Sequence, residues 1–89
     1  MPKSAVFFIW VIAVEYYKRI RVLREENDLT QQEAGKSIGL SQRTYAYYEA
    51  GKRVVPPSVL HDLADFYKVS VDYIMGRTDE RAPYPKAKK

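Results

Sequence analysis

The 89-residue sequence contains no cysteine and only one histidine, His61. Without cysteine there is no disulfide framework and no thiol chemistry, and a single histidine argues against a zinc site. The absence of cysteine also fits a reducing cytoplasm, which is the location we expect. The chain is long enough for one domain with one small core, but not for a separate catalytic domain. The sequence therefore predicts neither an enzyme nor a metal site, and we expect no cofactor.

The sequence also lacks a long hydrophobic run. Its longest apolar stretch is AVFFIWVIAV, which spans residues 5–14. A membrane-spanning helix needs about 20 such residues, so this stretch is too short and no membrane partner is expected. It has the length of the apolar part of a signal peptide, but no small-x-small cleavage site follows it.

Residues 1–15 are therefore interpreted as an apolar N-terminal extension. Their β-branched and aromatic side chains favour a strand buried on both faces, which the same strand of a second subunit would cover. One alternative is a helical continuation of the next segment. Another is a poorly ordered appendage, or a segment upstream of the natural start. Of these we favour a dimer-forming segment, in strand or helical form.

From residue 16 onward, hydrophobic residues recur at the three- and four-residue spacing that is typical of helices. We expect five short helices. The second begins at Thr30, whose side chain forms a capping box with Glu33. Gly39 is expected to end that helix in a left-handed turn. Ser41 caps the third helix, a proline pair begins the fourth, and Ser70 caps the fifth.

Helices joined by such tight connections predict a compact all-α domain over residues 16–76. Residues 77–89 are polar, contain two prolines and end in Lys-Ala-Lys-Lys, which is typical of a basic, flexible tail. The net charge of +4 and the isoelectric point near 9.4 are compatible with a polyanionic partner. Charge alone does not establish one.

Two stretches resemble the Xre/Cro-type helix-turn-helix family of phage-repressor-like DNA-binding proteins. They are LREENDLTQQEAGKSIGLSQRTYAYYEAGKR and LHDLADFYKVSVDYIMGRTD, and the resemblance covers about residues 17–79. It implies a five-helix domain whose third helix enters the major groove of DNA. The residues that carry it occur in the family's order: Leu23-Arg24, Leu29-Thr30-Gln31, Gly39, Glu49-x-Gly51-Lys52, Leu63-Ala64 and Val69-Ser70-x-Asp72.

The resemblance implies that residues at the start of the third helix contact bases. Glutamine can bond the N6 and N7 atoms of adenine together, and arginine can bond O6 and N7 of guanine. Taken without the resemblance, polar residues in a first helical turn are ordinary solvated side chains, and Tyr47 in particular is ambiguous. The predicted base-contacting residues are Gln42, Arg43, Thr44 and Tyr47.

Other positions are predicted to contact phosphates or to support the fold. Phosphate contacts supply the salt-sensitive part of DNA affinity without reading sequence. The resemblance further implies an ion pair between Arg24 and Glu49 that ties the first helix to the third. The predicted phosphate-contacting residues are Gln31, Lys36, Lys52 and Arg53.

The sequence departs from the family pattern in the second and third helices. Ala34-Gly35 stands where the family usually has Leu-Ala, which removes core volume and adds a glycine that weakens the helix by about 1 kcal/mol relative to alanine. We expect the inward-spaced Tyr45 and Tyr48 to fill that volume. Ala46 and Ala50 replace residues that are often polar, so fewer side chains are left to contact DNA.

These features predict a sequence-specific transcriptional regulator, a repressor that binds an inverted-repeat operator in double-stranded DNA as a homodimer. Its two third helices would enter successive major grooves about 34–36 Å apart. One alternative is a protein-interaction module, similar to an antitoxin or antirepressor, that binds its partner through residues 5–14. A second is a membrane-proximal regulator with its apolar N-terminus in the bilayer interface.

Overall fold

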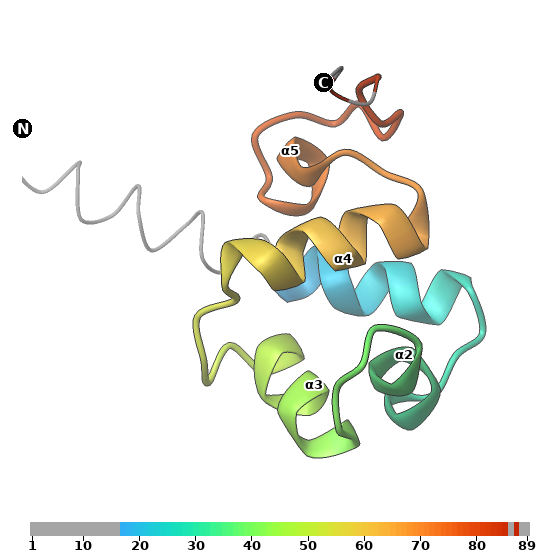
Figure 1. Cartoon of the computed structure of the whole chain (residues 1–89), viewed down its shortest axis with the longest axis vertical. Helices are drawn as coiled ribbons and strands as arrows, with labels where there is room; N and C mark the ends of the chain where they lie inside the picture. The colour runs from blue at the N-terminus through green and yellow to red at the C-terminus, as the bar shows by residue number, and fades with distance from the viewer. Residues whose placement is uncertain (1–16, 86, 88–89) are drawn as a thin grey trace, which may run out of the picture.

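The computed structural model describes residues 17–85 and residue 87. Within these residues the chain forms five helical segments and no strand, which confirms the predicted all-α fold (Figure 1). The predicted strand or helix over residues 5–14 lies outside the described residues. The segments are residues 17–26, which we call the first helix, α2 (Gln31–Ser37), α3 (Gln42–Glu49), α4 (Pro57–Tyr67) and α5 (Val71–Ile74).

The first helix and α4 cross the middle of the molecule, as Figure 1 shows. Helices α2 and α3 pack against each other at one end, and α5 packs against α4 at the other. The surface of α3 that faces away from the first helix and α4 is therefore free of other helices. Two of the predicted base-contacting residues, Gln42 and Arg43, are exposed on α3.

Hydroxyl side chains define where the short helices begin. Thr30 Oγ1 accepts a hydrogen bond of 3.0 Å from the Glu33 amide, and Glu33 Oε1 accepts one of 2.8 Å from the Thr30 amide, which is the predicted capping box. Ser41 and Ser70 each accept a bond from the amide three residues on, at 3.1 and 2.9 Å. Because α3 starts at the Ser41 cap, Gln42 becomes its first helical residue.

One continuous core joins all five helices. Tyr45 is fully buried and Tyr48 is 8% exposed, so both tyrosines point inward as predicted. The turn that links α2 to α3 contributes partly buried Leu40 to the same core. The buried hydrophobic residues are Ile20, Leu23, Ala34, Tyr45, Tyr48, Val55, Leu60, Leu63, Ala64, Val69, Tyr73 and Ile74.

Gly35 permits a close approach between α2 and the start of α3. A Cβ atom at this position would lie 3.1 Å from the carbonyl oxygens of Leu40 and Ser41, and 3.2 Å from Cβ of Tyr45. The departure from the family pattern thus has a structural reason, since the space of a larger residue is taken by the turn and by Tyr45. Gly39 lies in the turn itself with φ of 78°, the left-handed conformation predicted for it.

Residues 77–84, which the composition assigns to a tail, are bonded to the helical body. The Arg81 guanidinium donates two hydrogen bonds of 2.7 and 2.9 Å to the Glu26 carboxylate of the first helix. The carbonyl of Arg81 accepts a 2.9 Å bond from the amide of Ser70. The Tyr84 hydroxyl donates to Asp72 Oδ2 at 2.9 Å. No sequence pattern indicated these contacts.

Arg19 of the first helix makes a second set of contacts to the same region. Its Nη1 donates to the carbonyls of Tyr73 and Thr78 at 2.9 and 2.8 Å, and its Nη2 pairs with Asp79 at 2.9 Å. The ring of Tyr73 also lies 4.3 Å from the Arg19 guanidinium and 4.9 Å from that of Arg81. Arg19 and Arg81 therefore fasten residues 77–81 to the first helix and α5.

We predict that Gly35→Ala lowers the free energy of unfolding by about 1 kcal/mol, although alanine favours the helix. The gain of about 1 kcal/mol in helix propensity is exceeded by overpacking, which costs about 1–3 kcal/mol. Urea denaturation measures the change. The control is Gln32→Ala, an exposed position of the same helix, where stability should stay within about 0.5 kcal/mol. A more stable Gly35→Ala protein would contradict the close packing.

Candidate nucleic-acid interface

Helices α2 and α3, joined by the Gly39 turn, form a helix-turn-helix whose second helix is exposed along one side. Gln42 and Arg43 are exposed, whereas Tyr47 is half-buried. Thr44 is half-buried, and its hydroxyl accepts a 3.1 Å hydrogen bond from Ser41. Thr44 therefore takes part in the helix cap, whereas the other three side chains line the exposed side of α3.

Three of the predicted contact residues come together at the exposed side of α3. The Nε–H of Arg43 donates a 2.9 Å hydrogen bond to the Tyr47 hydroxyl. The Arg53 guanidinium, from the loop after α3, lies 4.9 Å from the centroid of the Tyr47 ring, and that of Arg43 lies 5.7 Å away. This Arg43–Tyr47–Arg53 cluster presents two positive charges around one aromatic ring.

The remaining predicted phosphate-contacting residues surround α3 less tightly. Lys36 in the last turn of α2 and Lys52 after α3 are both exposed. The amide of Lys52 donates to the carbonyl of Tyr47 at 2.9 Å, which fixes the backbone just after the helix. Gln31 is half-buried, and its Nε2 donates to Glu49 Oε1 at 3.3 Å. Gln31 therefore supports the end of α3 from the start of α2.

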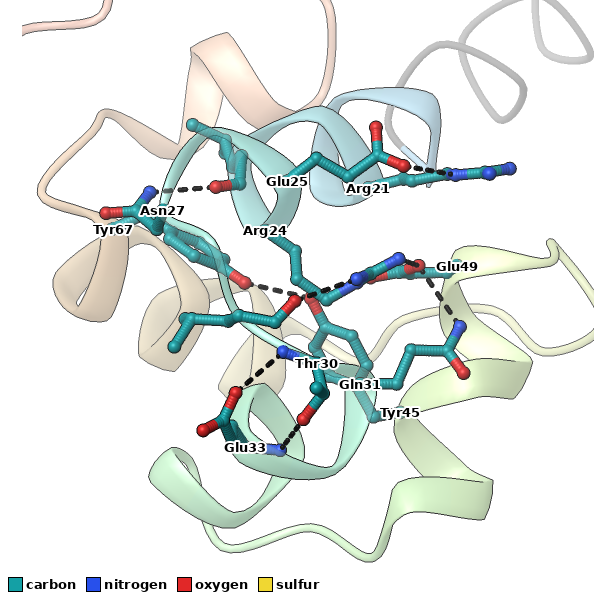
Figure 2. Close-up of polar contacts among 12 residues, drawn as sticks. Arg21, Arg24, Glu25, Asn27, Thr30, Gln31, Glu33, Tyr45, Glu49 and Tyr67 are labelled. Atoms are coloured by element: carbon teal, nitrogen blue, oxygen red, sulfur yellow. Dashed lines mark hydrogen bonds and ion pairs between the residues drawn. The ribbon is translucent and has the colours of Figure 1, made fainter.

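A buried ion pair connects the first helix to α3, as Figure 2 shows. Arg24 Nε donates to Glu49 Oε2 at 2.7 Å, and Arg24 Nη2 donates to Glu49 Oε1 at 3.2 Å. A third nitrogen of Arg24 donates to the carbonyl of Leu29 at 2.9 Å. The side chain of Glu49 is only 4% exposed and that of Arg24 only 14%. Removing either partner would leave the other charge buried without compensation.

Two tyrosine hydroxyls form a second buried contact beside this pair (Figure 2). Tyr45 of α3 and Tyr67 of α4 share a hydrogen bond of 2.9 Å. Burial raises the pKa of Tyr45, and the bond to Tyr67 raises it further. Burial also raises the pKa of Tyr67. Sequence reasoning placed Tyr45 in the core but missed Tyr67 as its partner, although a buried tyrosine usually finds a hydrogen-bond partner.

Other kinds of site find little support in the described part of the chain. Its histidine and acidic side chains form no group of three that could hold a metal ion. His61 is exposed on α4, with Nδ1 3.7 Å from Asp65 and 3.8 Å from Asp62. Over the described ranges, no helix is both long and apolar enough to cross a membrane.

The chain belongs to the helix-turn-helix family designated HTH_3, whose model matches residues 20–74. It is 41% identical over 68 residues to the uncharacterized HTH-type transcriptional regulator YobD of Bacillus subtilis. It is 38% identical over 56 residues to the cryptic phage CTXphi transcriptional repressor RstR of Vibrio cholerae. It is also 30% identical over 69 residues to the HTH-type transcriptional regulator AnsR of Bacillus subtilis.

These matches cover most of this chain but only part of each relative. They include 76%, 63% and 78% of the chain for YobD, RstR and AnsR, and 61%, 50% and 60% of those proteins. The chain therefore spans 50–61% of the length of these relatives. No solved structure matches it significantly. The matched family and relatives are transcriptional regulators rather than enzymes.

We predict that Glu49→Ala lowers the free energy of unfolding by about 3 kcal/mol, because it leaves the Arg24 guanidinium largely buried without its partner. Chemical denaturation measures the loss. The control is Glu25→Ala, whose carboxylate pairs with Arg21 at the surface and should contribute less than about 1 kcal/mol. An equal effect of the two substitutions would contradict a structural role for the buried pair.

We also predict that stability falls as the pH rises above about 10, where tyrosine ionises in the unfolded chain. Because the folded pKa values of Tyr45 and Tyr67 are raised, the folded chain keeps these two protons to a higher pH than the unfolded chain does. Their contribution is therefore complete below pH 10 and disappears above it. Denaturation at pH 8 to 11 measures this loss, which should be smaller in the Tyr45→Phe/Tyr67→Phe double variant.

The absorbance of tyrosinate provides an independent check. While folded, the wild type should develop little more tyrosinate signal near pH 10.5 than the double variant, since the raised pKa values of Tyr45 and Tyr67 delay ionisation of their hydroxyls. A larger signal from the folded wild type would contradict the buried tyrosine pair.

Proposed function

We propose that this chain is a sequence-specific DNA-binding transcriptional regulator that uses α3 as its recognition helix. The observation that carries the proposal is the Arg43–Tyr47–Arg53 cluster on the exposed side of α3. A cationic, aromatic helix surface of this kind matches the chemistry of base edges and phosphates in a major groove. The similarity to transcriptional regulators and to a phage repressor supports the same function.

The first turn of α3 would read the bases. Gln42 and Arg43 are exposed, and their side chains offer the bidentate contacts that distinguish adenine and guanine. Tyr47 would present its ring to the groove beside Arg43. Thr44 would contribute less, because its hydroxyl is bonded to Ser41 in the helix cap.

The groups around α3 would bind the phosphates. Lys36 precedes α3 in the sequence, and Lys52 and Arg53 follow it. All three side chains are exposed and positively charged. Gln31 would hold α3 through Glu49 and place its amide near the backbone of the DNA. Such contacts position the protein and raise its affinity for all sequences alike.

Repression by a homodimer is the finer part of the proposal. One recognition helix reads only a few base pairs, and two copies related by a twofold axis would read an inverted repeat with half-sites one helical turn apart. Residues 5–14 are the proposed dimer contact, since a second copy of the chain would shield their apolar side chains from water. Occupancy of the operator would then block transcription, and no cofactor is required.

Selection from a random duplex library by the purified full-length protein tests this function. We predict enrichment of an inverted repeat with half-sites about 34–36 Å apart. Weak retention without an enriched motif would instead favour a protein-interaction module that binds a partner through residues 5–14. Chromatography of the protein with and without the selected duplex determines whether two copies bind.

Two substitutions separate base contacts from phosphate contacts. Arg43→Ala should relax the preference at one position of each half-site, where the lost contact is worth about 1–3 kcal/mol. Lys52→Ala should weaken binding to all sequences and reduce the salt slope by about one unit. Arg77→Ala, an exposed arginine after α5, is the control and should change neither. A uniform loss across sequences in Arg43→Ala would contradict base contact by Arg43.

A further inference from the structure

The hydrogen bond between Arg43 and Tyr47 lies within the cluster on the exposed side of α3. The Nε–H of Arg43 donates to the Tyr47 hydroxyl at 2.9 Å. The two residues are four positions apart in α3, and such residues lie on the same face of a helix. The contact is therefore made within α3 itself and does not require DNA.

We propose that Tyr47 is a positioning residue that sets the base preference of Arg43 for guanine. An arginine recognises guanine through two N–H donors directed at O6 and N7. In this structure Tyr47 occupies Nε, and no other described residue bonds the terminal nitrogens Nη1 and Nη2 of Arg43. Those two nitrogens are left to face the two acceptors of guanine. This role rests on the DNA-binding function proposed above.

Positioning matters because Arg43 is exposed on the surface of α3. A long side chain that is free in the unbound protein loses rotamer freedom when it binds, and this loss weakens the contact. The bond to Tyr47 restricts Arg43 before DNA arrives and fixes the plane of its guanidinium. A contact that depends on direction, such as the bidentate bond to guanine, gains most from this restriction.

Arg53 contacts the ring of Tyr47, the residue proposed to position Arg43. The Arg53 guanidinium lies 4.9 Å from the centroid of the Tyr47 ring, a distance at which a cation is attracted to an aromatic face. Arg53 belongs to the loop after α3 and reaches the ring from outside the helix. Tyr47 is therefore fixed by its own helix and by this loop, and its hydroxyl stays within reach of Arg43.

The contact itself is tested first in the protein without DNA. In the wild type, the Nε–H signal of Arg43 in a nitrogen-15 spectrum should exchange slowly with water, and Tyr47→Phe should make it exchange at the rate of a free arginine. Tyr84→Phe is the matched control, because it also removes a tyrosine hydroxyl that takes part in a 2.9 Å hydrogen bond. The Tyr84 hydroxyl donates to Asp72, whereas the Tyr47 hydroxyl accepts from Arg43. Equal exchange in the wild type and Tyr47→Phe would overturn the proposal.

Base preference is tested on the selected duplex with guanine replaced by 7-deazaguanine, which lacks the N7 acceptor, at the position identified by Arg43→Ala. The wild type should bind the guanine duplex about tenfold more tightly than the substituted one. Tyr47→Phe should reduce that ratio to about threefold without a change in melting temperature. Tyr84→Phe should keep the wild-type ratio.

These experiments distinguish failure of the positioning role of Tyr47 from failure of the DNA-binding function. An unchanged ratio in Tyr47→Phe would overturn the positioning role while leaving DNA binding by α3 intact. If the library yields no preferred duplex, the DNA-binding function itself fails and this role fails with it. A parallel loss of affinity for both duplexes in Tyr47→Phe would show that Tyr47 contributes affinity alone, and would also overturn the role.

Discussion

The buried ion pair between Arg24 and Glu49 is the interaction on which the placement of α3 depends. Glu49 is the last residue of α3 and accepts hydrogen bonds from both Arg24 and Gln31. Arg24 also bonds the carbonyl of Leu29 just before α2. One carboxylate thus connects α3 to the first helix and to α2. Since both charges are largely removed from water, the geometry must be kept for the pair to be stable.

The other end of α3 is fixed by packing rather than by charge. Gly35 lets the turn and Tyr45 approach α2 closely, and the Tyr45 hydroxyl reaches Tyr67 on α4. The inner side of α3 is therefore held at its start and at its end. Gln42 and the Arg43–Tyr47–Arg53 cluster lie on the exposed side of α3. They are not part of the hydrophobic core, so their side chains are available for binding.

Local features of this fold were predictable from the sequence, because their signals lie within four residues of each other. The capping box at Thr30, the cap at Ser41 and the left-handed turn at Gly39 each depend on adjacent residues and elementary backbone geometry. The inward direction of Tyr45 followed from helical periodicity in the same way. The Arg24–Glu49 pairing came only from the family resemblance.

Contacts between distant residues were not predictable in this way. Spacing places Tyr45 in the core but does not select Tyr67, 22 residues away, among the tyrosines of the chain. The Arg43–Tyr47 contact is local. However, the long side chain of an exposed arginine can reach several neighbouring residues, and the sequence does not predict which of them it contacts. The bonds from residues 77–84 to the helices depend on the finished fold, so composition alone indicated a free tail.

Those bonds also bear on the order in which the domain assembles. The contacts of Arg19 with Thr78 and Asp79 and of Arg81 with Glu26 join residues separated by 55 to 60 positions. Closing a loop of that length costs more chain entropy than closing the short loops between neighbouring helices. We therefore expect the contacts between the first helix and the region after α5 to form late in folding. During synthesis, the first helix gains this attachment only after nearly the whole domain has emerged.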